Sequence, residues 1–532
     1  MSTLYFGDNL HILRDHLPDE SVDLIYLDPP FNSKRDYNLL FKTPKGQASD
    51  AQITAFEDTW HWGEQAEQEF TELIHQPNTD VSEMIQSLRR FLKESDMMAY
   101  LTMMANRLLE LHRVLKPTGS LYLHCDPTAS HYLKVVLDTI FGAVNFQNEI
   151  IWKRTSAHSD SKTMGNSHDS LFLYSKSNGF IWNKQYQAYD NTYIESHYRR
   201  IDKEGRRYRT DNLTAMGLSG GGYTYEWNGV TKLWRLPIER MQELHDAGRV
   251  HYTKTGTAEY IRYLDEMPGT PLQDLWDDIP PINSQAAERL GYPTQKPLAL
   301  LERILQASSN PGDTVLDPFC GCGTAVHAAQ KLGRNWIGID ITHLAISLIE
   351  KRMKDAFPGI AFDVLGTPQD FDSARNLAFR DKYQFQWWAC TLVNAQPFQG
   401  KKKGADTGID GLIYFQDEAK DVKKIIVSVK GGEHVTRTMI ADLKNSVERE
   451  KAQMGFFVTL TPPTQPMITE ATSAGYYESP WYGAFPKIQI LTIEGLLNGT
   501  EKPRYPDPSR GGLSFKKAKV EEEKAVQRKL EI

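Results

Sequence analysis

The pattern of apolar and polar residues predicts a layered α/β structure in the first 150 residues of the chain. Between Met97 and Leu115 the apolar side chains recur at the helical spacing, whereas Ser21 to Leu27 is a short, mainly apolar run typical of a buried strand. Because such strands alternate with helices, we expect a sheet covered by helices. The predicted strands lie at 4–6, 21–27, 120–125 and 148–152, and the predicted helical segments lie at 60–93, 97–115 and 131–141.

The α/β pattern is interrupted after residue 150 and resumes near residue 281. A polar, aromatic-rich segment with a glycine run at Ser219 to Gly222 fills the interruption. Beyond it, Leu298 to Ser308 is an amphipathic helix, and a third unit begins near residue 370. The chain therefore divides into five predicted parts, namely a first α/β part at 1–150, an insert at 151–280, a second α/β part at 281–360, a third domain at 370–500 and a charged tail at 501–532.

The strand that ends at Leu27 leads directly into Asp28, Pro29, Pro30 and Phe31. Two successive prolines fix two φ angles and remove two backbone donors, so the turn between the carboxylate and the aromatic ring is stiff. The Asp28 carboxylate and the Pro29 carbonyl can accept from one amino group, while Phe31 can stack on a planar ring. An amine held by two acceptors directs its lone pair away from both and becomes a better nucleophile. A proline-stiffened loop after a buried strand is the alternative interpretation.

The composition excludes several classes of protein. With 40% hydrophobic and 24% charged residues, the chain has the composition of an ordinary globular protein. It does not open on a basic segment followed by a long apolar stretch, and no run approaches the length of a membrane span. We therefore expect a cytoplasmic protein without a membrane partner. Neither a disulfide framework nor a paired zinc signature is formed by the four cysteines, Cys125, Cys320, Cys322 and Cys390.

The net charge of -7 conceals a basic insert. Residues 151–263 contain 7 Lys and 10 Arg against 12 Asp and Glu, which gives +5, so the remaining residues carry -12. Tyrosines and tryptophans interleave with these charges, and a basic, aromatic-rich segment is typical of a nucleic-acid surface. A polar domain with its own small core is the alternative. The clustered arginines are Arg199, Arg200, Arg206, Arg207 and Arg209.

A second turn of chemical interest follows the predicted strand at 313–317. The segment from Asp317 to Gly323 connects this strand to a helix, and its glycines let a ligand approach the backbone closely. It lacks the Gly-Lys-Ser/Thr ending of phosphate-binding loops and the Gly-x-Gly-x-x-Gly dinucleotide fingerprint. Asp340 ends the next predicted strand, where an acid meets ribose hydroxyls in folds of this kind. The combination suits an adenosyl ligand without a pyrophosphate, and a glycine turn that only lets a helix pack on a strand is the alternative.

In the order of these motifs the chain resembles the DNA amino-methyltransferases of the β class, in which a catalytic segment precedes a target-recognition insert and a cofactor segment. Asp28 to Phe31 matches the catalytic motif, and Asp317 to Gly323 matches the cofactor loop. Thr294 to Pro297 matches the segment beside the methionine end of the cofactor, and Gly7-Asp8 matches an early acid. The resemblance covers about the first 355 residues. It implies an S-adenosylmethionine-dependent methyltransferase (Rossmann-like) fold with an inserted target-recognition domain.

The resemblance assigns roles to individual residues. It implies Asp28, Pro29, Pro30 and Phe31 as the catalytic residues at the target base, and S-adenosylmethionine as the cofactor. The implied substrate is double-stranded DNA whose target base is flipped out of the stack. Cys320 and Cys322 have no chemical role in this family, so we interpret them as packing residues. The implied cofactor-binding residues are Asp8 near adenine, Lys296 near the methionine end, Asp317 near the amino group, Phe319, Gly321 and Gly323 along the loop, and Asp340 on the ribose.

The first residue of the catalytic motif favours adenine as the target base. Enzymes that make N4-methylcytosine commonly begin this motif with Ser, adenine-N6 enzymes with Asp and protein-glutamine enzymes with Asn. The large insert also resembles a DNA target-recognition region, which favours DNA over RNA or protein. The resemblance thus implies a site-specific adenine-N6 DNA methyltransferase of a restriction-modification or phage-defence system, with possible restriction or defence subunits as partners. A cytosine-N4 enzyme and a DNA-binding protein with an inactive methyltransferase fold are the alternatives.

The third domain contains an acid and a lysine that two adjacent strands bring to one edge. Asp410 precedes a predicted strand at 412–415, and Lys430 lies near the end of the next one. At such an edge a carboxylate can hold a divalent metal while an ammonium group meets a scissile phosphate. Over about residues 375–495 the pattern resembles the restriction-endonuclease-like α/β fold of the Mrr type, which implies Asp410 and Lys430 as nuclease residues and Asp410 as a Mg²⁺ ligand.

One residue departs from the endonuclease pattern. The family usually places Glu or Gln two residues before the lysine, whereas this chain has Ser428, a weaker metal ligand. Gln384 or Gln386 is a candidate substitute. An active Mg²⁺-dependent nuclease and an inactive domain that only grips DNA or a partner are therefore both compatible with the sequence.

Overall fold

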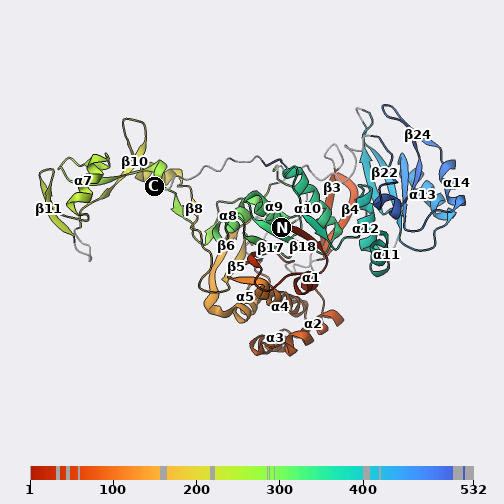
Figure 1. The fold of residues 1–532 in the computed structure, drawn as a ribbon, viewed down its shortest axis with the longest axis horizontal. Helices are drawn as coiled ribbons and strands as arrows, with labels where there is room; N and C mark the ends of the chain where they lie inside the picture. Colours follow the sequence, from red (N-terminus) through yellow and green to blue (C-terminus); the bar gives the residue numbers. More distant parts are fainter. Residues whose placement is uncertain are drawn as a thin grey trace. The chain divides into compact units, whose positions relative to one another are not determined.

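The structure is a computed structural model that describes residues 2–30, 36–42, 48–57, 60–155, 164–215, 222–283, 286, 288–290, 292, 294–398, 408–418, 421–506 and 519–521. The chain separates into two compact units, Met1–Asn183 with Asp274–Ile532, and Lys184–Gln273 (Figure 1). No helix within the described ranges combines the length and apolar character that a membrane span requires.

A nine-stranded sheet forms the centre of the first unit. Its strand order is β16-β6-β7-β5-β2-β17-β18-β1-β19. Strand β7 is antiparallel to both of its neighbours, whereas every pair from β5 to β19 is parallel. All six residues of β2 are buried, as expected for a strand with packed layers on both faces. The strands are β1 Thr3–Phe6, β2 Val22–Leu27, β5 Leu115–Cys125, β6 Phe146–Lys153, β7 His168–Ser175, β16 Leu275–Trp276, β17 Thr314–Asp317, β18 Asn335–Asp340 and β19 Asp363–Leu365.

Helices connect these strands, so the predicted α/β fold is confirmed. The side chain of Ser95 caps the longest of them by accepting from the backbone N–H of Met98. We predicted that the segment after this helix would begin its strand at Ser120, but the strand starts at Leu115, which pairs with Val22 of β2. Sheet pairing here overrides the local turn signal of Lys116 to Gly119. The helices are α1 Asn9–His16, α2 Glu64–His75, α3 Thr79–Leu92, α4 Asp96–Val114, α5 Ser130–Leu137, α8 Leu298–Ser308, α9 Thr324–Lys331 and α10 His343–Ala356, with the short η1 Asp138–Gly142 and η2 Ala143–Asn145.

Four neighbouring parallel strands end at the same edge of this sheet. Strand β1 ends at Phe6, β2 at Leu27, β17 at Asp317 and β18 at Asp340. Ligands of open α/β sheets bind at this carboxyl edge, close to the point where the strand order reverses. The acids that follow or end these strands are thereby brought together from positions more than 300 residues apart in the sequence.

The second unit is shorter than the predicted insert. Strands β6, β7 and β16 belong to the central sheet, so 151–183 and 274–280 are part of the first unit and the insert proper is Lys184–Gln273. Apolar runs in these flanks pair with the sheet, which a change in composition alone does not reveal. The unit has a small core of Leu213, Trp234, Met241 and Ala258. Its elements are β8 Tyr186–Gln187, α6 Asn191–His197, β9 Arg200–Ile201, β10 Arg207–Asn212, β11 Tyr223–Trp227, β12 Val230–Trp234, α7 Ile238–Asp246, β13 Val250–Tyr252, β14 Ala258–Tyr263, η3 Leu264–Glu266 and β15 Thr270–Pro271.

A five-stranded sheet of order β20-β21-β22-β23-β26 lies in the C-terminal part of the chain. Strand β23 pairs in parallel with β22 and with the edge strand β26, and the apolar runs of β22 and β23 are buried almost throughout. The elements are α11 Phe371–Arg380, α12 Lys382–Leu392, β20 Gln396–Pro397, β21 Gly411–Phe415, β22 Lys423–Lys430, α13 Arg437–Arg449, β23 Met454–Thr459, α14 Gln465–Ser473, β24 Tyr476–Ser479, β25 Gly483–Pro486, β26 Ile488–Thr492 and α15 Ile493–Leu497, and a separate pair is formed by β3 Asp36–Lys42 and β4 Ala48–Glu57.

Candidate active site

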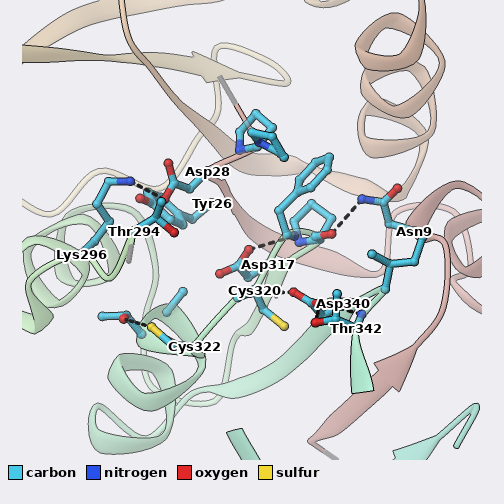
Figure 2. A pocket seen from close by; sticks show the side chains of 18 of the residues that line it. Asn9, Tyr26, Asp28, Thr294, Lys296, Asp317, Cys320, Cys322, Asp340 and Thr342 are labelled. Carbon is cyan, nitrogen blue, oxygen red and sulfur yellow. Dashed lines mark hydrogen bonds and ion pairs between the residues drawn. The ribbon is translucent and has the colours of Figure 1, made fainter. Parts of the chain in front are cut away.

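A cavity of about 280 Å³ opens at the carboxyl edge of the central sheet (Figure 2). Both sequence motifs contribute to its wall, since Asp28 and the loop after β17 face the same space. Among the described lining residues there are four acids and two basic residues. The acids are Asp8, Asp28, Asp317 and Asp340, and the basic residues are Arg107 and Lys296. The cavity therefore favours a ligand with positive charge. Its remaining lining includes Gly7, Asn9, Tyr26, Pro29, Pro30, Trp60, Met103, Tyr292, Thr294, Leu301, Pro318, Phe319, Cys320, Gly321, Cys322, Thr324, Ala325, Ile341 and Thr342.

The corner after β2 presents Asp28 to this cavity, and Pro29 and Pro30 also line it. The Asp28 carboxylate forms an ion pair with the ammonium group of Lys296, which Figure 2 marks with a dashed line. We predicted Lys296 as a cofactor residue, whereas in this structure it pairs with Asp28, which we predicted as a catalytic residue. Phe31, the fourth residue of the motif, lies outside the described residues.

The loop between β17 and α9 is shaped by two glycines with positive φ. Gly321 has φ +50 and Gly323 has φ +72, a region that other residues rarely adopt. A Cβ atom on Gly323 would lie 2.8 Å from Cγ1 of Ile349, so a larger residue there would force the loop and α10 apart. The Gly321 N–H donates to the carboxylate of Asp340 over 2.9 Å, which ties the loop to the end of β18. The loop that contains Gly321 and Gly323 is therefore held at the end of β18 by Asp340.

Two of the cavity acids, Asp317 and Asp340, have raised pKa values. Burial raises the pKa of the Asp317 carboxyl well above its usual range, and the carboxylates of Asp28 and Asp340 raise it further, while Lys296 opposes this rise. Burial also raises the pKa of Asp340 to about 6, against the effect of the N–H donors of Thr342 and Gly321. Carboxyl groups held close together in a buried site favour a cation that would stabilise their charged forms.

Arg107 also lines the cavity and was not predicted from the sequence. Its guanidinium group donates to Asp8 over 2.9 Å, to Oδ1 of Asn9 over 2.6 Å and to the carbonyl of Met103 over 3.1 Å. Asn9 in turn donates to the carbonyl of Pro318 over 2.8 Å. Asp8 also caps α1 by accepting from the N–H of Leu10. Arg107 lies within the regular apolar pattern of α4, so only its three-dimensional position indicates a role.

The two loop cysteines, Cys320 and Cys322, are buried. Burial raises the pKa of both Cys320 and Cys322 thiols, which keeps them protonated at neutral pH. Arg352 supports the loop from behind by donating to the carbonyl of Cys322 over 2.9 Å and to the hydroxyl of Thr324 over 3.2 Å.

The predicted basic surface of the insert is partly neutralised within its own unit. Arg206 pairs with Asp265 and Glu266 over 2.9 Å, and Arg209 lies 3.6 Å from Asp211. Arg199 and Arg207 are exposed and take part in no ion pair among the described residues. These two arginines are therefore the better candidates for contact with a polyanion.

The C-terminal sheet brings Asp410 and Lys430 to within 3.8 Å of each other. The carboxylate of Asp410 already accepts from the backbone N–H of Val429 over 2.7 Å and from the Ser428 hydroxyl over 3.5 Å. No group of three or more His, Cys, Asp and Glu side chains that could hold a metal ion occurs in the described part of the chain.

The fold and the cavity together define an α/β protein with a ligand cavity at the carboxyl edge of its sheet. Residues 22–351 match the DNA methylase family (N6_N4_Mtase), and the chain belongs to this family. The C-terminal segment 391–490 matches the family of the NACHT-associated inactive Restriction Endonuclease 1. The predicted restriction-endonuclease-like domain is thus confirmed, and the Mrr type that we predicted describes it only approximately.

Relatives of the chain include methyltransferases of restriction-modification systems. The chain is 34% identical over 259 residues to the Type II methyltransferase M.EcaI of Enterobacter cloacae, across 48% of this chain and 57% of that protein. It is 28% identical over 347 residues to the Type III restriction-modification enzyme StyLTI Mod subunit of Salmonella typhimurium, across 61% and 49%. It is 25% identical over 351 residues to the DNA adenine methyltransferase YhdJ of Escherichia coli, across 66% and 82%. The chain spans about half the length of the first two.

Proposed function

We propose that the protein is a site-specific DNA methyltransferase that moves a methyl group from S-adenosylmethionine to N6 of adenine. The observation that carries this proposal is that Asp28 and the glycine loop after β17 line one cavity. Membership of the DNA methylase family supports the DNA substrate. Because the named relatives are bacterial proteins and bacterial DNA lies in the cytoplasm, we propose that this protein acts in the cytoplasm as well.

The lining residues fit S-adenosylmethionine. Gly321 and Gly323 leave room beside the backbone, and the excess of acids suits a ligand with a net positive charge. Asp340 would hold the ribose hydroxyls, Asp8 would lie near the adenine, and Asp317 would hold the amino group. When bound, the cofactor supplies an electrophilic methyl group on a sulfonium centre.

The protein supplies alignment of the acceptor amine. We propose that the Asp28 carboxylate and the Pro29 carbonyl accept the two N–H bonds of the target amino group, and that Phe31 stacks on the base. Both acceptors lie on the stiff turn after β2, so the direction of the amine lone pair is fixed before reaction. The target base must leave the DNA helix to reach this buried corner. After transfer the surplus proton of the amine can pass to the Asp28 carboxylate.

Adenine is favoured over cytosine because the catalytic motif begins with Asp28. The relative YhdJ is named as a DNA adenine methyltransferase, which supports the same base. The Mod subunit of StyLTI is named as part of a restriction-modification enzyme, and we propose a similar association with restriction or defence subunits for this chain.

Label transfer tests this function directly. Purified protein is incubated with genomic DNA from a methylation-deficient host and with S-adenosylmethionine carrying a labelled methyl group, and the digested nucleosides are separated by mass spectrometry. Labelled N6-methyladenine is the expected product. Labelled N4-methylcytosine would show that the target base is cytosine and not adenine. DNA without label would overturn the proposed methyl transfer.

We propose that the C-terminal domain binds DNA or a partner and does not cleave DNA. The residues there do not fit a catalytic Mg²⁺ site, since Ser428 occupies the place of the usual second ligand and Asp410 is held by Val429 and Ser428. The match to an inactive endonuclease family supports this reading. Unmethylated DNA should therefore stay intact when incubated with the protein and Mg²⁺, and cleavage that Asp410→Ala abolishes would contradict the proposal.

A further inference from the structure

The ion pair between Asp28 and Lys296 creates a conflict inside the candidate active site. In the proposed function Asp28 accepts a hydrogen bond from the target amino group, yet in this structure its carboxylate is held by the ammonium group of Lys296. Both side chains are largely buried, with exposed fractions of 15% for Asp28 and 12% for Lys296. An ion pair that is shielded from water does not separate spontaneously, because each charge would then be buried without a partner.

The same cavity offers Lys296 another partner when it is loaded. The amino-acid end of S-adenosylmethionine carries a carboxylate, and this group has to be accommodated between four acids. Among the lining residues that the structure describes, two bring positive charge, and one of them, Arg107, is held by Asp8, Asn9 and Met103. Lys296 is the lining cation at the Asp28 and Asp317 end. Its field reaches Asp317 as well as Asp28, since Lys296 lowers the pKa of Asp317 against the effect of burial.

We propose that Lys296 is a positioning residue that exchanges one carboxylate for another. In the empty cavity it holds Asp28, and in the loaded cavity it holds the carboxylate of the cofactor and leaves Asp28 available for the amino group of the base. This inference rests on the proposed methyl transfer and adds an order to it, because a base could be captured productively only after the cofactor is bound. The exchange moves no proton and breaks no covalent bond.

The exchange predicts a competition that can be measured without DNA. S-adenosylhomocysteine has the amino-acid end of the cofactor but no sulfonium charge, whereas methylthioadenosine lacks the amino-acid end. If Asp28 competes for Lys296, then Asp28→Asn should tighten S-adenosylhomocysteine by about 3- to 10-fold in isothermal titration calorimetry, with little change for methylthioadenosine. Lys296→Met should weaken S-adenosylhomocysteine by about 10- to 100-fold, the range of a charge-assisted hydrogen bond, and should again spare methylthioadenosine.

The double variant separates exchange from a general change in charge. In Asp28→Asn/Lys296→Met the gain from Asp28→Asn should vanish, because there is no ammonium group left to release. Lys296→Arg should keep most of the preference for S-adenosylhomocysteine. Lys354, an exposed residue of α10 paired with Glu350, provides the matched control, and Lys354→Met should change neither affinity.

The possible failures can be told apart. If the wild-type protein binds S-adenosylhomocysteine but Asp28→Asn leaves its affinity unchanged, or if Asp28→Asn tightens it equally in the absence of Lys296, the exchange is wrong while methyl transfer stands. If Lys296→Met weakens both compounds equally, Lys296 shapes the cavity and does not hold the carboxylate. If the wild-type protein binds neither compound, the proposed function itself fails.

Discussion

Asp340 connects the chemistry of the cavity to a measurable titration. Its carboxylate accepts from the N–H groups of Gly321 and Thr342, and yet burial raises its pKa to about 6. The neutral form therefore becomes the main form of Asp340 below about pH 6. A group that must accept hydrogen bonds from ribose hydroxyls would lose part of this ability when it is protonated.

We predict that affinity for S-adenosylhomocysteine rises as the pH increases through about 6 and levels off above it. The sign follows from the raised pKa: the bound ribose favours the charged carboxylate, so binding is weakened at pH values where Asp340 is protonated, by at most about tenfold per pH unit. Asp317 has a raised pKa of the same sign. Calorimetry from pH 5 to 8 measures the slope of log affinity against pH. In Asp340→Asn this slope should be smaller by up to about one, because one titrating carboxyl group is lost. Identical profiles for the two proteins would refute this role of Asp340.

Single residues also mark how far the sequence could predict the site. Asp28, Asp317 and Asp340 were predicted because each follows or ends an apolar run, and parallel strands bring such ends to one edge. Arg107 could not be predicted, since its place on α4 is one polar position in an ordinary helical pattern. The pairing of Lys296 with Asp28 was equally inaccessible, because residues 268 positions apart meet only through the tertiary fold.

At the scale of elements, the loop between β17 and α9 depends on glycine for two separate reasons. Gly323 has a positive φ, and a side chain there would also collide with Ile349 of α10. Gly333, just after α9, has almost the same φ of +73 but nothing within 4 Å of an added Cβ. The pair therefore allows the cost of backbone conformation to be separated from the cost of contact.

We predict that Gly323→Ala lowers the free energy of unfolding by about 1–3 kcal/mol and weakens binding of S-adenosylhomocysteine. Gly333→Ala should cost about 1 kcal/mol and leave binding intact, because only the backbone preference is affected. Urea unfolding and calorimetry measure both quantities. Equal effects of the two substitutions on binding would mean that the contact with Ile349 does not shape the loop.

Element boundaries were predicted less well than the elements themselves. Strand β5 begins at Leu115 because it pairs with β2, although Lys116 to Gly119 carries turn residues. We predicted that the insert begins at residue 151, because the charge and the aromatic content change there. However, β6 and β7 still belong to the central sheet. In both cases strand pairing between distant segments decides the boundary, and no local pattern records it.

At the scale of the whole molecule, the protein combines a methylase part, an insert and an endonuclease-like part. The insert was predicted as a DNA surface from its arginines, but several of them are bound to neighbouring acids. A residue paired in this way contributes little net attraction to a phosphate backbone. The electrostatic contribution of the insert should therefore come from a few residues and not from the whole cluster.

We predict that Arg207→Ala weakens DNA binding and reduces the slope of log affinity against log salt by about one. Arg206→Ala should leave this slope nearly unchanged, because its guanidinium group is held by Asp265 and Glu266. Fluorescence anisotropy with a labelled duplex at several salt concentrations makes the comparison. A larger change of slope for Arg206→Ala than for Arg207→Ala would show that the ion pairs open on DNA.

The central claim is that the Asp28 carboxylate holds the amino group that receives the methyl. The most direct measurement compares methyl transfer with cofactor binding in Asp28→Ala, using DNA from a methylation-deficient host and labelled S-adenosylmethionine. We predict that transfer falls by at least about 10²-fold while S-adenosylhomocysteine binds at least as tightly as to the wild-type protein. Transfer at the wild-type rate by Asp28→Ala, with labelled N6-methyladenine as the product, would contradict the account.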